Sequence, residues 1–248
     1  NLNNDFKYQQ IGTYLIKMSA GIKIDVNEEK KILKFTQTGS SDWVLILGGN
    51  LSYWNLEFNG LNPIFESEDL YAQRFNNYGL TGCLSIYESI INNSTFSIQG
   101  GGCEDSINFI NSVGENITLD IKNAMADAVD ADFSNLSFTN INIANAGNDC
   151  FDMSGGKYEI RNANFDGCND KALSVGEKST FKADNLIVKN TNIAISAKDL
   201  SKVLISTLDA ENINLCAEVK RKKQEFGGAR LEINNYKCLS IYDVDNES

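Results

Sequence analysis

Three aspartates near the middle of the chain have the residue type and spacing for acid–base chemistry or for metal binding: Asp130, Asp132 and Asp152. Asp130 and Asp152 are 22 residues apart, and Asp132 lies two residues beyond the first. If residues at that spacing stack, two carboxyl groups about 5 Å apart repel each other, which raises the pKa of one unless a cation intervenes. Such a pair could supply the acid and the base or nucleophile of a glycosidase. The same three side chains offer the hard oxygen ligands that calcium prefers.

Lysines follow the aspartates at the same spacing. In a polysaccharide lyase, calcium would neutralise a uronate carboxylate while a nearby lysine abstracts the sugar proton. Lys171 and Lys198 are therefore catalytic candidates alongside the three aspartates. The residues predicted to bind substrate are Asp127, Asp149, Lys220, Tyr87 and Tyr242.

Each of these residues also has a purely structural interpretation. Asp105, Asp127 and Asp149 recur 22 residues apart where turns are expected, and aspartates at turns cap backbone N–H groups. The lysines could simply form a solvated face that offsets acidic neighbours. Aspartate is disfavoured within strands. For Asp130, Asp132 and Asp152 we therefore weigh a functional role and a structural role equally.

These side chains belong to a sequence repeat of 22 residues, which would determine their positions in the fold. The first apolar column is Ile107, Val129, Phe151, Leu173, Ile195, Ala217 and Leu239. The second, two residues on, is Phe109, Ala131, Met153, Val175, Ala197, Val219 and Ile241. The residues between them are polar: Asn108, Asp130, Asp152, Ser174, Ser196, Glu218 and Ser240. Apolar, polar, apolar indicates strands with one buried face, and a fixed step of this length indicates stacked coils of a solenoid.

The remainder of each coil also has a strand pattern. Segments 117–121, 136–138, 157–160 and 230–233 alternate, and Ile121, Ile143, Phe165 and Ile187 keep the 22-residue step on a second sheet. A leucine-rich repeat would place leucine at most buried positions, whereas these mix Ile, Val, Phe, Met and Ala. The predicted fold is all-β: a parallel β-helix with coils of about 22 residues, in which Asn and Gly mark turns.

The repeat divides the chain into expected parts. Residues 1–40 do not fit it and are predicted to form an N-terminal cap and the first strands. Residues 41–248 are predicted to form the β-helix, with an inserted loop at about 60–80 that holds the single proline, Pro63. The chain begins at Asn1 and stops within a coil, so we expect a trimmed or mature segment whose open coil end is covered by a tail, by further chain, or by a partner in an oligomer.

Composition narrows the function classes. The formal net charge is −11 and the sequence pI is about 4.6, which argues against nucleic acid and anionic membrane surfaces as partners. There is no long apolar run, so no membrane insertion is expected. The chain lacks histidine and Cys-x-x-Cys pairs, which argues against zinc. Cys216 and Cys238 should stack in disulfide range, although free buried cysteines are the favoured alternative.

Three stretches carry a resemblance: residues 148–155 (Asn-Asp-Cys-Phe-Asp-Met-Ser-Gly), 170–179 and 197–199. They resemble right-handed parallel β-helix repeats of the pectin-lyase-like superfamily, most of all the subgroup of polysaccharide-associated bacterial surface proteins. The resemblance covers roughly residues 40–245 and implies a right-handed coil, polysaccharide as substrate or ligand, and a secreted or cell-surface location. The Gly-His-Gly and Arg-x-Lys signatures of polygalacturonases are absent, as is the Tyr/His pair of alginate epimerases.

Two functional hypotheses follow from different classes. The first is a polysaccharide-processing enzyme, a lyase or a hydrolase, that uses the acidic patch on one sheet. The second is a non-catalytic module for carbohydrate binding, adhesion or structural assembly. The aspartates within strands favour the first hypothesis, and the missing catalytic signatures favour the second.

Overall fold

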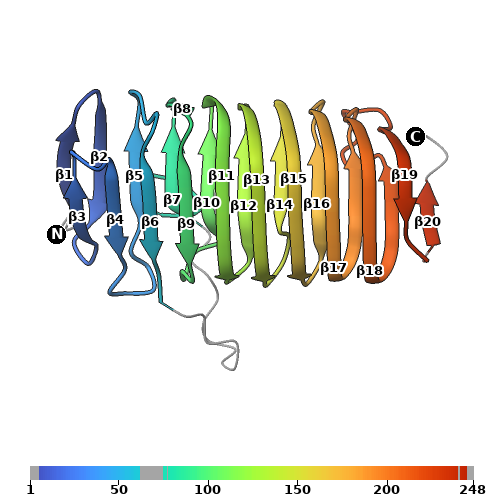
Figure 1. Ribbon diagram of the computed structural model, residues 1–248, viewed down its shortest axis with the longest axis horizontal. Coiled ribbons are helices and arrows are strands. Elements are labelled where there is room, and N and C mark those ends of the chain that lie inside the picture. Colours follow the sequence, from blue (N-terminus) through green and yellow to red (C-terminus); the bar gives the residue numbers. More distant parts are fainter. Residues whose placement is uncertain (1–5, 62–74, 77, 240, 245–248) are drawn as a thin grey trace.

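The chain is a parallel β-solenoid of about 8 turns, each of about 22 residues (Figure 1). The computed structural model describes residues 6–61, 75–76, 78–239 and 241–244, the last four by their backbone. Within those ranges there is no helix, and hence none that could cross a membrane. The predicted fold class is confirmed. The proposed inserted loop at 60–80 falls largely on residues outside the described ranges, as do Ser240 and the side chain of Tyr242.

One side of the solenoid carries the candidate residues and is called face A. It is built from β5 (Val44–Leu47), β7 (Gly82–Tyr87), β10 (Asp105–Ile110), β12 (Asp127–Asp132), β14 (Phe151–Ser154), β16 (Lys171–Gly176), the C-terminal parts of β17 (Thr180–Lys198) and β18 (Lys202–Lys220), and β20 (Ile241–Val244). The rest of the coils comprises β4 (Ile32–Thr36), β6 (Asn55–Asn59), β8 (Ile90–Asn92), β9 (Thr95–Gln99), β11 (Val113–Ala124), β13 (Asn135–Ala146), β15 (Lys157–Cys168) and β19 (Arg230–Lys237). All these neighbouring strands of consecutive coils pair in parallel.

The first strands pair differently. β1 (Phe6–Ile11) and β2 (Tyr14–Ser19) form an antiparallel hairpin, β2 continues antiparallel onto β5, and β3 (Lys23–Asn27) is antiparallel to β4. The parallel ladder therefore gives way to antiparallel strands at the N-terminal end of the solenoid (Figure 1).

The predicted stacking holds along face A until the last coil. Val129 pairs with Phe151, and the column continues in register to Ala217. Ala217 then pairs with Tyr242 rather than with Leu239, whose side chain is fully exposed. The prediction for the last coil is wrong because the segment 221–229, which links β18 to β19, lengthens that coil.

A one-residue shift also occurs on the second sheet. Phe165 pairs with Val188, and Ile187 is 42% exposed instead of buried. Thr180 pairs with Lys157, which is 23 residues earlier, so the turn before β17 has taken up one extra residue. A slip of one position in a strand exchanges its inner and outer faces, which is why the prediction for Ile187 is wrong.

Serine hydroxyls form a buried column at one turn of the coils. The N–H of Ser89 donates to the hydroxyl of Ser112 (3.1 Å), and the N–H of Ser112 donates to the hydroxyl of Ser134 (3.0 Å). In the next coil Gly156 takes the serine position, and the hydroxyl of Tyr158 accepts from the N–H of Ser134 (3.3 Å). A Cβ at Gly156 would lie 2.1 Å from the main-chain oxygen of Ser134 and 2.6 Å from that hydroxyl oxygen. The glycine and the tyrosine therefore replace one serine together.

Tyr158→Phe should lower the free energy of unfolding by about 1–3 kcal/mol, because it leaves a buried N–H of Ser134 without an acceptor. The hydroxyl also donates to the carbonyl of Ala131 at 2.8 Å. Urea unfolding measures the change. Gly156→Ser should also destabilise the fold, and adding Tyr158→Phe should not recover the loss, because a Cβ at Gly156 overlaps the main-chain oxygen of Ser134. Equal stability of Tyr158→Phe and the wild type would show that the hydroxyl does not hold this turn.

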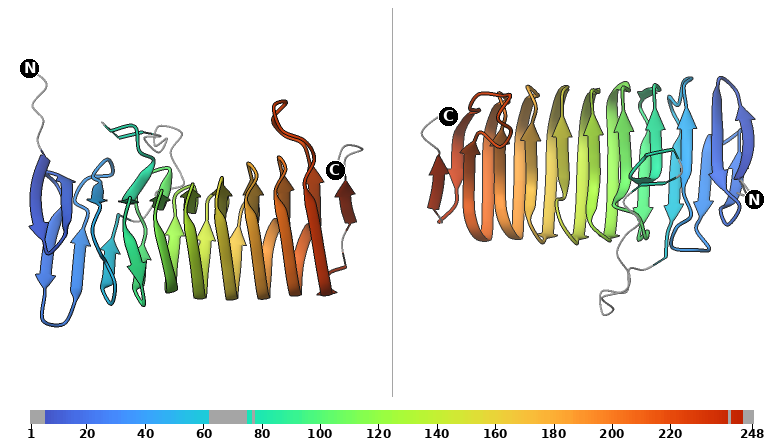
Figure 2. Two further views of the ribbon diagram at one scale, coloured as in Figure 1. Left: turned by 90° about the horizontal axis from the view of Figure 1, so that it is seen from above. Right: turned by 180° about the vertical axis from the view of Figure 1, so that it is seen from behind.

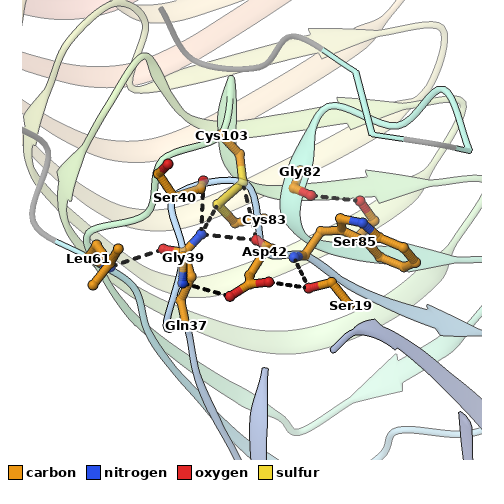
Figure 3. The surroundings of a disulfide bond; sticks show 11 residues. Ser19, Gln37, Gly39, Ser40, Asp42, Leu61, Gly82, Cys83, Ser85 and Cys103 are labelled. Atoms are coloured by element: carbon orange, nitrogen blue, oxygen red, sulfur yellow. Dashed lines mark hydrogen bonds between the residues drawn. A yellow bond between two sulfur atoms is a disulfide. The ribbon is translucent and has the colours of Figure 1, made fainter. Parts of the chain in front are cut away.

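A buried cluster of hydrogen-bonded polar residues connects the first strands to the coils beside the disulfide Cys83–Cys103 (Figure 3). The side-chain amide of Gln37 donates to the main-chain oxygen of Asp42 at 2.9 Å, and it lies 3.7 Å from the sulfur of Cys83. The carboxylate of Asp42 accepts from the hydroxyl of Ser19 at 2.8 Å. Gln37 is 3% exposed and Asp42 is 9% exposed, so these hydrogen bonds satisfy polar groups that water reaches poorly.

All six cysteines form disulfides: Cys83–Cys103, Cys150–Cys168 and Cys216–Cys238. The favoured prediction of free buried thiols is wrong, and the Cys216–Cys238 pairing that the spacing allowed is present. The other two pairs are separated by 20 and 18 residues, so the 22-residue step did not reveal them. Three disulfides indicate an oxidising, extracytoplasmic environment.

Candidate acidic site on face A

Asp130 and Asp152 lie side by side on face A. They are register partners on the adjacent parallel strands β12 and β14, and Asn108 on β10 and Ser174 on β16 extend the same column. Adjacent strands are about 4.8 Å apart, which brings the two carboxyl groups within interaction range. The alternation that buries Val129 and Ala131 in the core directs Asp130 to the outer side of the same strand.

Asp130 is held in an environment that favours its neutral form. Burial raises the pKa of Asp130 well above the usual carboxyl range, and repulsion from Asp105, Asp132 and Asp152 raises it further. The side-chain amide of Asn108 donates to Oδ2 of Asp130 at 3.1 Å, which fixes the orientation of the carboxyl group. A carboxylic acid that keeps its proton near neutral pH can act as a general acid.

The surrounding carboxyl groups are shifted in the same direction. Burial raises the pKa of Asp127 to about 7, although the hydrogen bond from the N–H of Asp149 lowers it in part. Burial and the charge of Asp152 raise the pKa of Asp132 to about 6. Asp105 is only 2% exposed, its Oδ2 has no hydrogen-bond partner, and burial raises its pKa well above the usual value. Several of these groups therefore hold protons in the folded chain at pH values where a free aspartate would be charged.

Asp152 has a different environment from Asp130. Its side chain is 32% exposed, and the ammonium of Lys198 lies 4.0 Å from its Oδ1. Lys198 itself is 6% exposed and donates to the hydroxyl of Ser174 at 2.7 Å. Lys198 therefore reaches back from β17 across Ser174 toward Asp152. The two stacked aspartates differ in the charges and exposure around them.

Other predicted residues lie at different distances from the pair. Lys171 pairs with Asp149 at 3.5 Å and also with Asp170, so its ammonium belongs to the entry edge of face A. The main-chain N–H of Asp149 donates to Asp127 (2.8 Å), which bears out a turn-capping role beside any functional one. Asp127, Asp149 and Lys171 thus form a chain of contacts along neighbouring coils.

Lys220 and Tyr87 are not part of this group. Lys220 is on β18, four strands from Asp130, and it pairs with Glu218 at 2.8 Å. Tyr87 is the last residue of β7. It lies in the same column as Asp132, two strands away. The structure therefore brings together the acidic candidates with Lys198, and it leaves these two substrate-binding candidates outside.

The segment 221–229 is a basic cluster in the sequence, and it contributes Lys223, which was not among the predicted site residues. This segment projects from one side of the solenoid (Figure 2, left). The main-chain N–H groups of Lys222 and Lys223 donate to Asp199 at 2.7 and 2.8 Å, and the side chain of Lys223 forms an ion pair with Glu177. The charge of Lys223 also acts on Asp132, lowering a pKa that burial raises. Asn108, by contrast, was detectable because it belongs to the column of Asp130.

The predicted calcium ligands are Asp130, Asp132 and Asp152, which lie on β12 and β14. In the described ranges no group of three acidic or sulfur-bearing side chains is placed to hold a metal ion. Calcium dependence itself stays a prediction.

Comparison with protein-family models, with curated proteins and with solved structures found no match.

Proposed function

We propose that the chain is a polysaccharide hydrolase in which Asp130 is the general acid and Asp152 is the nucleophile. The observation that carries the proposal is the stacked pair itself: two adjacent carboxyl groups, one with a raised pKa and one beside an ammonium group. Glycosidases need this division between a protonated and a charged carboxyl group.

The spacing of the strands favours retention of configuration. Side chains that stack on adjacent strands are about 5 Å apart, which is the separation of the two carboxyl groups in retaining glycosidases and is smaller than the separation in inverting ones. In the first step Asp130 gives its proton to the glycosidic oxygen while an Oδ of Asp152 attacks the anomeric carbon, so the C–O bond to the leaving sugar breaks. In the second step water attacks that carbon, gives a proton back to Asp130 and releases Asp152.

The polysaccharide assignment rests on the fold and on the resemblance. The parallel β-solenoid supports the pectin-lyase-like comparison made from the sequence, although a fold alone does not determine activity. The three disulfides support a secreted or cell-surface location, where polysaccharides are available. The flanking ammonium groups of Lys171 and Lys198 favour a polymer that contains uronate.

A substrate screen tests the proposal. Polygalacturonate, alginate, hyaluronan and xylan are incubated with the protein, with calcium and with a chelator, and both new reducing ends and absorbance from unsaturated uronate are followed. We expect reducing ends without unsaturated products and with no loss in chelator. Unsaturated products that require calcium would identify a lyase instead, and retention of polymer without cleavage would identify the non-catalytic binding module.

A further inference from the structure

Phe133 occupies an unusual position directly after Asp132. Its φ is +49°, in the left-handed region that phenylalanine rarely adopts, and its side chain is 62% exposed. Its N–H donates to the carbonyl of Ser154 at 2.9 Å, which anchors the turn to the strand of Asp152. Left-handed backbone and an exposed aromatic ring are both unfavourable for the free protein.

The neighbouring coils show what the turn itself requires. The equivalent positions are held by Glu88, Asn111 and Gly155, all with positive φ. These are polar or glycine residues, the ordinary choices for a left-handed turn at the surface. The turn therefore does not need an aromatic residue, and the phenylalanine stands in the coil that carries Asp130.

The ring of Phe133 is held against the next coil. A Cβ built at Gly155 would lie 2.6 Å from the ring, so the absence of a side chain at Gly155 makes room for the ring. The ring thus rests on the end of β14, three residues beyond Asp152, with much of its surface open to solvent. A strained, exposed side chain that is fixed in place beside a candidate site points to a role in that site.

We propose that Phe133 is a stacking platform for a sugar ring of the polysaccharide, one position away from the bond that Asp130 and Asp152 cleave. The C–H face of a pyranose ring is apolar and matches the flat, exposed face of the phenylalanine. This inference rests on the proposed function for its ligand class. It assigns to the site an aromatic residue in place of Tyr87, which lies further away.

Affinity electrophoresis in gels that contain polygalacturonate, alginate, hyaluronan or xylan tests the platform separately from cleavage. The inactive Asp152→Asn protein is the background, so that the polymer persists. We expect at least one polymer to retard it, and Phe133→Asn to weaken that binding on the order of tenfold while Phe133→Tyr retains it. Asparagine suits a left-handed turn, so the melting temperature of Phe133→Asn should not fall.

Tyr53 supplies a matched control. It also has a positive φ (+68°) and is 68% exposed, but it precedes β6, away from face A. Tyr53→Asn should leave retardation unchanged. Retardation that is equal for Phe133→Asn and its background, a lower melting temperature for Phe133→Asn, or no retardation by any of the four polymers would overturn the platform. Binding that depends on Phe133 without cleavage by the wild type would overturn the hydrolase and leave the platform standing.

Discussion

Asp130→Asn is expected to lower kcat on the cleaved polysaccharide by about 10²–10⁴-fold, because asparagine cannot give a proton to the leaving sugar. Asp152→Asn should be at least as damaging, since it removes the nucleophile. Exposed Asp120→Asn, on the strand β11, is the matched control and should retain full activity. Reducing-end assays under saturating substrate measure all three variants, and circular dichroism checks that each is folded. Full activity of Asp130→Asn would remove the general acid from the mechanism.

The pH profile adds a second readout of the same role. Burial raises the pKa of Asp130, so the active protonated form should persist above the pH at which an ordinary carboxyl group loses its proton. Activity should fall on the alkaline side as Asp130 ionises. An activated substrate with a good leaving group needs little protonation, so it should partly rescue Asp130→Asn but not Asp152→Asn. The same rate loss for both variants on that substrate would contradict the assigned division of roles.

The anomeric product tests the second half of the mechanism. Proton NMR of the early products should show the configuration of the substrate, because the stacked carboxyl groups leave no room for a water molecule between the nucleophile and the sugar. Early inversion would assign Asp152 as a base that activates water.

The fold was predictable because residues at one fixed spacing in the sequence stack on adjacent coils of a solenoid. Val129, Phe151 and Leu173 could be aligned from the sequence, and the placement of Asp130 beside Asp152 followed directly from that alignment. The prediction was wrong where the spacing changes, as at Ile187 and Leu239, since insertions in turns shift the register without altering local composition. Hydrophobic periodicity constrains strands, and it contains no information about the length of the next turn.

The candidate site shows the same limit. The acidic column is periodic, whereas Lys223 approaches Asp132 through the path of the segment 221–229, which no repeat specifies. The disulfides Cys83–Cys103 and Cys150–Cys168 join residues in different positions of adjacent coils. The approach of Lys223 and these two disulfides depend on the conformation of turns, which the repeat does not predict.

The free energy of unfolding is expected to be higher at pH 5 than at pH 8, by about 4 kcal/mol. The pKa of Asp127 is raised to about 7 and that of Asp132 to about 6, while both groups have ordinary values near 4 in the unfolded chain. A group with a raised pKa in the folded state binds protons more strongly when folded. Its stabilising contribution is complete below about pH 4 and is lost as the pH rises to about 7.

Neighbouring charges modify the size of the effect but not its sign. The ammonium groups of Lys171, Lys198 and Lys223 face the acidic group and offset part of the repulsion at high pH. Burial would raise the pKa of Glu218, but hydrogen bonds from Lys220 and Ser196 lower it overall, which gives a smaller contribution of opposite sign. Guanidinium unfolding at pH 5 and pH 8, with the disulfides intact, measures the difference.

Asp105→Asn identifies the source of this pH dependence. The carboxyl group of Asp105 is 2% exposed and has an unpaired oxygen, so its ionisation in the folded chain is costly. Asparagine removes that charge and the repulsion it exerts on Asp130, and it should raise stability at pH 8 more than at pH 5. Asp120→Asn should change the two values equally, because Asp120 is exposed beside Lys122. A wild-type protein that gains stability between pH 5 and pH 8 would show that these carboxyl groups are not held in their protonated forms, and the general-acid assignment of Asp130 would lose its electrostatic basis with them.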